Sequence, residues 1–138
     1  MYVAIDFGIS NTDLAISDQG KIVFHTTPSQ SSGINAGTLK NILKKHEIDI
    51  SNIKKIGVTG GKSSDLDDAL EGVEIAKINE IDAIGLGAKK LYGIGEESAL
   101  VVSAGTGTAC VHVQGNNFNH LGGIAVAGGM LEGLGSLL

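Results

Sequence analysis

The expected secondary structure of this chain begins with three strands and a helix, and the same order of elements begins again later in the chain. Three short strands, the last two joined by a hairpin turn at 18–20, precede a helix with apolar residues at helical spacing. Three strands followed by a helix start again near residue 96. The expected ranges are strands at 3–6, 13–17, 21–26, 55–58, 73–78, 99–102, 108–114 and near 118, and helices at 39–46, at 79–91 and from 128 onward. This alternation of strands and helices predicts an α/β fold.

Composition and charge exclude several classes of protein. The chain has 138 residues, 42% of them hydrophobic and 18% charged, which is enough for an ordinary folded core. Its net charge is −5 and no run of Lys or Arg exceeds two residues, so nucleic acid is not expected as a partner. The single cysteine, Cys110, excludes an internal disulfide and fits a reducing compartment. Without a signal peptide or a run of roughly 18 apolar residues, the sequence predicts a cytoplasmic protein with no membrane partner.

Four glycine-bearing segments fall at the ends of expected strands. They are Asp6–Thr12, Val58–Gly61, Ser103–Thr108 and Gly122–Met130. Glycine lets backbone N–H groups approach a ligand and permits positive φ, which concave anion-binding turns need. One such turn is weak evidence because tight turns also use glycine. Four of them in one short chain, two with flanking hydroxyls, indicate a phosphate-binding cleft and ATP-dependent phosphotransfer.

These segments carry a resemblance to a known family. The repeated opening, with an acidic, glycine-containing first turn, resembles the two-lobed actin, sugar-kinase and Hsp70 superfamily. In order and near spacing, the segments 6–8, 58–61, 80–83, 105–108, 122–124 and 128–135 look like those of the type II pantothenate kinases. The resemblance implies an actin-like ATPase (ribonuclease H-like) fold, with a first lobe and its mixed sheet at 1–95 and the opening strands of a second lobe at 96–138. It covers the N-terminal portion of such an enzyme.

The resemblance also implies ATP and Mg²⁺ as cofactors, held at the glycine-bearing turns. From the residues alone, Asp6 fits either an Asx-type turn or a carboxylate that organises Mg²⁺ through water. The turn at 105–107 fits either a phosphate-binding turn or a plain hairpin, and Gly128-Gly129 fits either a helix N-terminus with free N–H groups or close helix packing. The resemblance implies that Asp6 holds the metal and that the nucleotide is bound by Asp6, Gly8, Ser10, Asn11, Thr12, Gly105, Thr106, Gly107, Thr108, Gly128, Gly129, Met130, Leu131 and Glu132.

Two acidic residues open the expected second helix. Glu80 and Asp82 complement the helix dipole there, which would by itself explain them. The resemblance aligns Glu80 with the family's catalytic base, and it implies substrate binding by His120, Gly122 and Gly123. Two positions depart from the family pattern. His120 stands where related enzymes tend to carry an arginine, and Asp13 stands where they usually have a lysine.

Three classes of function follow from the sequence. The first is a kinase acting on pantothenate, or a related hydroxyl compound, in coenzyme A synthesis. The second is a nucleotide-driven activator ATPase of the same superfamily, and the third is a noncatalytic or truncated module. An apolar stripe on the last helix, made by Met130, Leu131, Leu134, Leu137 and Leu138, predicts self-association as a homodimer.

Overall fold

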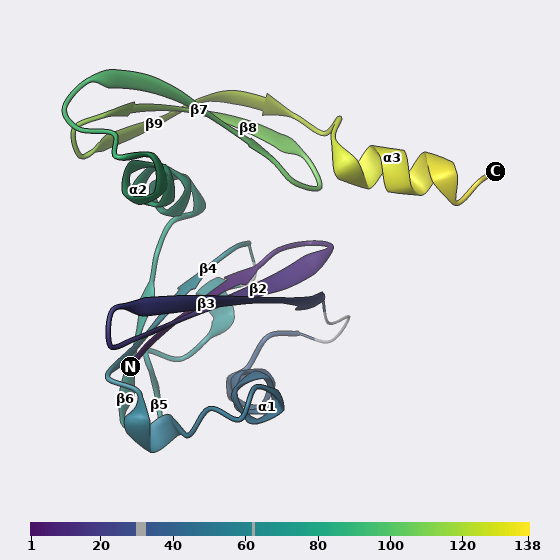
Figure 1. Ribbon diagram of the computed structural model, residues 1–138. Coiled ribbons are helices and arrows are strands. Elements are labelled where there is room, and N and C mark those ends of the chain that lie inside the picture. Colours follow the sequence, from purple (N-terminus) through teal and green to yellow (C-terminus); the bar gives the residue numbers. More distant parts are fainter. Residues whose placement is uncertain (30–32, 62) are drawn as a thin grey trace. The chain divides into compact units, whose positions relative to one another are not determined.

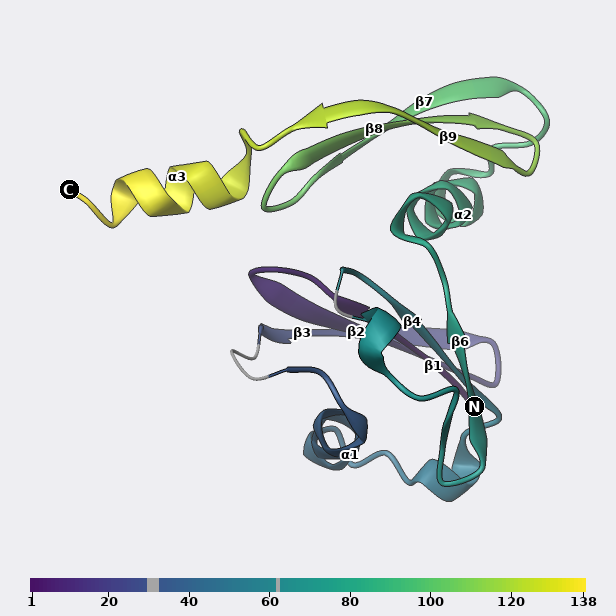
Figure 2. The same ribbon diagram turned by 180° about the vertical axis from the view of Figure 1, so that it is seen from behind.

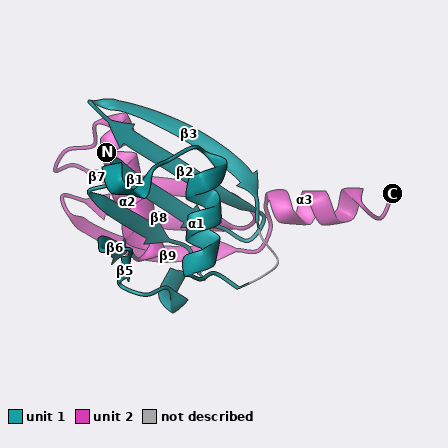
Figure 3. Ribbon diagram, turned by 90° about the horizontal axis from the view of Figure 1, so that it is seen from below, with its two compact units in different colours: residues 1–78 teal, residues 79–138 magenta. Residues whose placement is uncertain are grey.

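The computed structural model describes residues 1–29, 33–61 and 63–138, which divide into two compact units (Figures 1 and 3). The first unit comprises residues 1–78 and the second residues 79–138. Each unit is built on its own sheet. This division differs from the expected lobes, because helix α2 (Glu80–Tyr92) belongs to the second unit. The lobe boundary at 95/96 stays a prediction.

The first unit contains a mixed sheet of six strands in the order β3-β2-β1-β4-β6-β5. Strands β1, β4 and β6 run parallel, whereas β2, β3 and β5 are each antiparallel to a neighbour. The strands are β1 (Tyr2–Phe7), β2 (Asn11–Asp18), β3 (Lys21–Pro28), β4 (Lys55–Thr59), β5 (Ala69–Leu70) and β6 (Val73–Lys77). The expected strands of this unit are confirmed. The two-residue β5 was not expected, because so short a strand has no alternation to detect.

Helix α1 (Ala36–Lys45) covers one face of this sheet (Figure 2). Its start is fixed by a capping box, in which the Asn35 side chain accepts a hydrogen bond from the Thr38 backbone N–H at 3.1 Å. Strand residues alternate between this buried face and the opposite, exposed face. The buried core comprises Val3, Ile5, Phe7, Leu14, Ile34, Leu39, Ile42, Leu43, Ile53, Ile56, Val58, Leu66, Leu70 and Ile75. The opposite face carries the exposed carboxylates of Asp6 and Asp13 together with exposed apolar side chains such as Tyr2 and Phe24.

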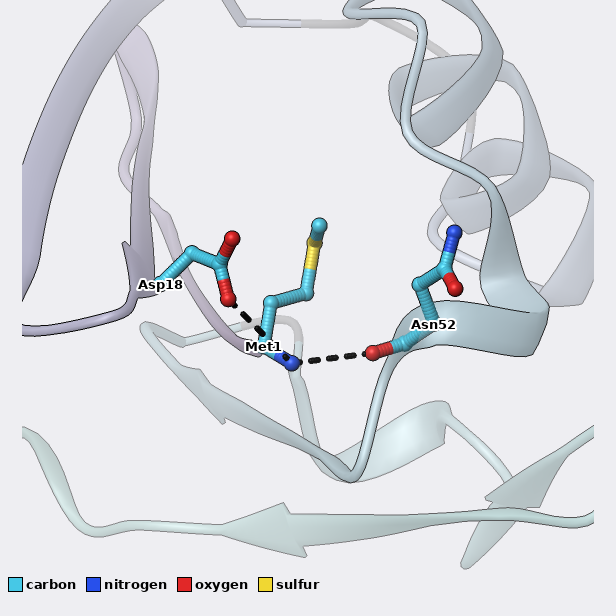
Figure 4. A network of polar contacts seen from close by, with 3 residues as sticks. All are labelled: Met1, Asp18 and Asn52. Atoms are coloured by element: carbon cyan, nitrogen blue, oxygen red, sulfur yellow. Dashed lines mark hydrogen bonds and ion pairs between the residues drawn. The ribbon is translucent and has the colours of Figure 1, made fainter.

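The N-terminal amine joins two parts of the first unit (Figure 4). The amine of Met1 donates to the backbone carbonyl of Asn52 at 2.9 Å, and it lies 3.8 Å from the carboxylate of Asp18. Asn52 ends a short 3₁₀ helix, Ile50–Asn52, that leads into β4, and Asp18 ends β2. These contacts hold the start of β1 in register with both neighbouring strands.

The second unit contains a three-stranded antiparallel sheet with α2 packed against it. Its strands are β7 (Ser98–Ala104), β8 (Thr108–Gln114) and β9 (Asn117–Ile124). Val111 and Val113 of β8 are fully buried, and the ring of Phe118 lies directly against the backbone of Gly85, where no Cβ would fit. Helix α2 ends at Gly93 with a left-handed φ of 66°. The short helix α3 (Gly128–Gly135) follows β9, and none of its eight residues is buried.

The sequence predicted that the fourth glycine segment begins at the end of a strand, and the structure shows that it does not. Gly122 and Gly123 lie inside β9, which extends to Ile124. The pairing with β8 shifts by one residue between Cys110 and Val111, so a β-bulge occurs here. A Cβ on Gly123 would lie 2.3 Å from the backbone oxygen of Thr108. Close strand pairing at the bulge therefore accounts for glycine at this position.

His46 is the C-cap residue of α1, and the pKa of its ring leads to a prediction of how the stability of the first unit depends on pH. Its centroid lies 4.5 Å from that of His25 on β3. Burial, and then the nearby charges of His25 and Lys45, lower the pKa of His46 below its ordinary value of 6.5. The unfolded chain therefore takes up this proton at higher pH than the folded chain does. Stability from this group is present above about pH 6.5 and is lost as the pH falls toward the folded pKa.

We expect the urea concentration at the midpoint of unfolding to decrease as the pH is lowered from 7.5 to the folded pKa of His46. In His46→Gln this decrease with pH is expected to be smaller. His120→Gln is the matched control, because His120 is exposed on β9. Parallel pH profiles for the wild type and His46→Gln would refute the role of His46.

Candidate functional site

The turn between β1 and β2 is held in place by the segment that follows β3. The Ser29 backbone N–H donates to the carbonyl of Ser10 at 2.9 Å, and the Ser29 hydroxyl donates to the carbonyl of Gly8 at 3.1 Å. A Cβ on Gly8 would lie 2.7 Å from the backbone oxygen of Asn11, so only glycine fits this turn. The predicted ligand residues Gly8, Ser10 and Asn11 thus share one tightly fixed turn.

A row of polar residues crosses four neighbouring strands on the exposed face of the first sheet. Strand pairing places Asp6 of β1 opposite both Asp13 of β2 and Thr59 of β4, and it places Asp13 opposite Thr26 of β3. We call Thr26, Asp13, Asp6 and Thr59 the polar row. Asp6 and Asp13 are both exposed. The hydroxyl of Thr26 donates a hydrogen bond to the carboxylate of Asp13.

The end of β4 lies against the Asp6 carboxylate. Gly60 follows β4 with a φ of +93°, and a Cβ there would lie 2.4 Å from the backbone oxygen of Phe7 and 2.8 Å from Asp6 Oδ1. Beside it, the hydroxyl oxygen of Thr59 is buried and has no hydrogen-bond partner within residues 1–29, 33–61 and 63–138. Thr59 was not singled out in the sequence. Only the register of β4 against β1, which composition does not reveal, could have identified it.

Thr12 differs from the other residues predicted to bind nucleotide near the first turn. It lies inside β2, paired with Phe7, and its side chain is only 5% exposed. Because neighbouring residues of a strand point to opposite faces, it faces the α1 side and not the side of the polar row. Its role in nucleotide binding stays a prediction, as do those of Asp6, Gly8, Ser10 and Asn11.

In the second unit, two of the predicted glycine segments meet. The three residues 105–107 join β7 to β8, and the start of α3 packs directly on them. The Gly128 backbone N–H donates to the carbonyl of Gly105 at 3.0 Å, and that of Gly129 donates to the carbonyl of Thr106 at 3.1 Å. The Thr108 hydroxyl donates to the carbonyl of Val126 at 3.1 Å. The connection is thus a hairpin turn that also seats the N-terminus of a helix.

These contacts explain the glycines at the start of α3 by close packing on the turn at 105–107. A Cβ on Gly129 would lie 2.5 Å from Thr106 Cγ2 and 3.0 Å from the Thr106 carbonyl oxygen. The N–H groups of Met130 and Leu131 donate to the carbonyl of Ala127, as those of Gly128 and Gly129 do to the turn. Of the two alternatives for Gly128-Gly129, free N–H groups and close packing of the helix, the structure shows close packing, and these N–H groups have protein partners. Contact of Gly128 to Glu132 with ATP stays a prediction from the resemblance.

Glu80 and Asp82 lie exposed in the first turn of α2. The Asn79 side chain accepts a hydrogen bond from the Ile81 backbone N–H at 2.8 Å and so caps the N-terminus of the helix. Both carboxylates are placed to complement the helix dipole, and the role of Glu80 as a base stays a prediction. His120 is exposed on β9 opposite Val111, and the unpaired residue of the bulge, Leu121, separates it from Gly122. Substrate binding by His120, Gly122 and Gly123 likewise stays a prediction.

The chemistry of the polar row fits a hard cation. Carboxylate and hydroxyl oxygens are the donors Mg²⁺ prefers, and Mg²⁺ keeps several waters and needs only one or two protein carboxylates. Over the described ranges, no group of three or more His, Cys, Asp or Glu side chains is close enough to hold a metal ion. The Asp6 carboxylate therefore suits a hydrated Mg²⁺ that a ligand helps to bind, and its role as metal ligand stays a prediction. In the described part of the chain, no helix is both long and apolar enough to cross a membrane.

Comparison with curated proteins finds relatives of one kind. The chain is 31% identical over 140 residues to a type II pantothenate kinase from Oceanobacillus iheyensis, a match to 99% of this chain and 48% of that protein. It is 28% identical over 143 residues to one from Bacillus anthracis, with the same two coverages. One from Bacillus cereus is 36% identical over 92 residues, which is 62% of this chain and 33% of that protein. The chain spans about half the length of the relatives that it matches throughout. No protein-family model matches it.

Comparison with solved structures establishes the fold. The activator of 2-hydroxyisocaproyl-CoA dehydratase from Clostridium difficile with bound ADPNP matches at a TM-score of 0.69 and 20% identity, over 99% of this chain and 51% of that one. Component A of (R)-2-hydroxyglutaryl-CoA dehydratase from Acidaminococcus fermentans matches at 0.61 and 19%, over 86% and 46%. The ROK hexokinase from Thermus thermophilus matches at 0.56 and 18%, over 85% and 47%. The chain has the expected actin-like ATPase fold.

Proposed function

We propose, from the relationship of this chain to the N-terminal portion of type II pantothenate kinases, that the full-length protein transfers a phosphoryl group from ATP to pantothenate or a related small hydroxyl compound. The observation that carries this proposal is the match to such kinases over 99% of the chain at 31% and 28% identity. The actin-like ATPase fold is consistent with it, since one solved neighbour holds ADPNP. The product would be a phosphorylated precursor of coenzyme A.

The proposed base of the reaction is Glu80. Its carboxylate accepts the proton of the acceptor hydroxyl as that oxygen attacks the γ-phosphorus, and ADP leaves. It lies in the first turn of α2, at the N-terminal end of that helix. Its exposure leaves it accessible to a substrate. Asp82 acts as a helix-end residue with no proton to transfer.

The polar row and the glycine turns would position the nucleotide. Bound Mg²⁺ would neutralise charge on the phosphates, and Asp6 is the residue proposed to hold it through water. The hairpin turn at 105–107 and the start of α3 are hydrogen-bonded to each other, so any contact that they make with the phosphates would be made by one connected element. His120, the residue proposed to bind the acceptor substrate, is exposed. A histidine side chain is not permanently charged, so it cannot supply the bidentate charged contact that an arginine makes.

The test is direct product detection. Full-length protein is incubated with Mg·ATP and pantothenate, and the products are separated by mass. Pantothenate that has gained one phosphoryl group supports the proposal. Unmodified pantothenate, together with ATP that has been hydrolysed to ADP and free phosphate, would contradict it.

A second candidate is a nucleotide-driven activator ATPase of the same superfamily, which uses nucleotide to drive a partner and needs no substrate base. Asp13 and His120, the two departures from the kinase pattern, are the observations that favour it. The structural likeness to one dehydratase activator at 20% identity, and to component A of another dehydratase at 19% identity, concerns the fold alone.

We further propose that the 138-residue chain self-associates as a two-fold dimer through α3. Leu131 and Leu134 on this helix are 72% and 55% exposed, and exposed apolar side chains of this kind favour burial against a partner. Leu137 and Leu138, which the sequence placed on the same helix, follow its end at Gly135 and are also exposed. In sedimentation at tens of micromolar, the chain is expected to be dimeric and Leu134→Lys largely monomeric. Ile22→Lys, which places the same charge at a residue 50% exposed on β3, is the control and should stay dimeric. A wild-type monomer would refute the proposal.

A further inference from the structure

The hydroxyl of Thr59, the last residue of β4, is a polar group that the fold does not satisfy. Its oxygen is buried and has no hydrogen-bond partner in the parts of the chain that the structure describes. Buried side-chain oxygens almost always have a partner, because an unsatisfied one loses its bonds to water without replacement. The buried hydroxyl of Thr38, by comparison, donates to the carbonyl of Gly33 at 3.2 Å. The free protein therefore keeps the Thr59 hydroxyl at a cost in stability.

The turn that follows β4 is held together without this hydroxyl. The backbone N–H and the hydroxyl of Ser63 both donate to the carbonyl of Gly60, at 3.0 and 2.8 Å. Strand β4 itself pairs through its backbone with β1 and β6. A valine has nearly the same shape as a threonine and also favours strands, so it would serve the fold equally well at this position. No described contact gives the Thr59 hydroxyl a role in holding the fold.

Thr59 lies beside the residue that is proposed to hold Mg²⁺. Thr59 and Asp6 are register partners in the parallel strands β4 and β1, so their side chains lie on the same face of the sheet. A Cβ on Gly60 would lie 2.8 Å from Asp6 Oδ1, whereas the missing Cβ of Gly61 has open space around it. A buried hydroxyl without a partner and a glycine whose side chain would intrude on the carboxylate thus occur together at Asp6.

We propose that Thr59 is a further ligand-binding residue, whose hydroxyl finds its hydrogen-bond partner in the water shell of the Mg²⁺ that accompanies the nucleotide. The inference rests on the proposed ATP-dependent function. Mg²⁺ keeps several of its waters when it binds to proteins, and a threonine hydroxyl oxygen can accept a hydrogen bond from such a water. Because the oxygen is buried in the free protein, binding includes a small movement of the backbone at Gly60 and Gly61. The bound protein then has the hydrogen bond that the free protein lacks.

The experiment uses Thr59→Val in the full-length protein and measures two quantities. The first is the Tm without ligand, which is expected to rise by about 2–4 °C because an unsatisfied hydroxyl has been removed. The second is the Kd of a fluorescent, nonhydrolysable ATP analogue with saturating Mg²⁺, which is expected to rise about five- to tenfold because the bound state loses a hydrogen bond. A residue with a structural role alone would not make the free protein more stable and the complex weaker.

Two further variants serve as controls. Thr59→Ser keeps the hydroxyl, so its Kd is expected to stay within about threefold of the wild-type value. Thr38→Val makes the same chemical change on α1, on the other face of the sheet, at a hydroxyl that has a partner. Its Tm is expected to fall and its Kd to stay unchanged.

The possible results separate this inference from the proposed function. Unchanged affinity in Thr59→Val, a Tm that does not rise, or an equal loss of affinity in Thr59→Ser would each overturn the role of the Thr59 hydroxyl, while the proposed function stands. If the wild-type protein does not bind the analogue with Mg²⁺, the proposed function fails and the inference fails with it.

Discussion

Replacement of Glu80 by glutamine in the full-length protein is expected to lower kcat by a factor of about 10²–10⁴ and to leave the KM for ATP nearly unchanged. Glutamine keeps the size of the side chain and most of its hydrogen bonds but cannot accept a proton. Glu80 is exposed in the first turn of α2, and the cap of that helix is made by Asn79, so the substitution should not disturb the fold. Steady-state kinetics with pantothenate as acceptor measures the effect.

Asp82 provides the matched control for this substitution. It is also an exposed acidic residue in the first turn of α2. Asp82→Asn is expected to cost much less activity, because a residue that only complements the helix dipole contributes about 0.3–1 kcal/mol. Equal losses of kcat in the two variants would contradict the role of Glu80 as the base.

Replacement of Gly129 by valine is expected to weaken binding of Mg²⁺ and a nonhydrolysable ATP analogue by about tenfold or more. The new Cβ would lie 2.5 Å from the Thr106 side chain and 3.0 Å from the Thr106 carbonyl oxygen. The carbonyl is backbone and also accepts the hydrogen bond of the Gly129 amide, so relief of the clash separates α3 from the turn at 105–107. Calorimetry on the full-length protein measures the affinity.

Gly133→Val makes the same change on the same helix at a position with open space around the missing Cβ. Affinity for the analogue should be retained in this control. Undiminished affinity in Gly129→Val would show that the contact between the turn and α3 does not form part of a nucleotide site.

Most of the secondary structure was predictable because its signals are local. The alternation of Val3 and Ile5 with exposed residues identifies β1, and the spacing of Leu39, Ile42 and Leu43 identifies α1. The bulge at Leu121, next to Gly122, was not predictable, because it depends on how β9 pairs with β8, and a glycine beside a bulge looks the same in sequence as a glycine at a strand end.

The candidate site could be predicted only in part, for a related reason. Glycine at Gly129 suits both a phosphate and a close backbone contact, since both require a missing Cβ, and the structure shows the close contact. Whether Thr12 faces the same side as Asp6 depends on strand pairing, as does the place of Thr59 next to Asp6. Long-range register decides these questions, and a single sequence does not contain it in readable form.

The most direct test of the account measures ADP release by the full-length protein with and without pantothenate, in the wild type, Glu80→Gln and Asp82→Asn. The account predicts that pantothenate stimulates ADP release in the wild type, that Asp82→Asn retains most of this stimulation, and that Glu80→Gln loses it. ADP release that is independent of pantothenate in all three proteins would contradict the kinase function and favour the activator ATPase.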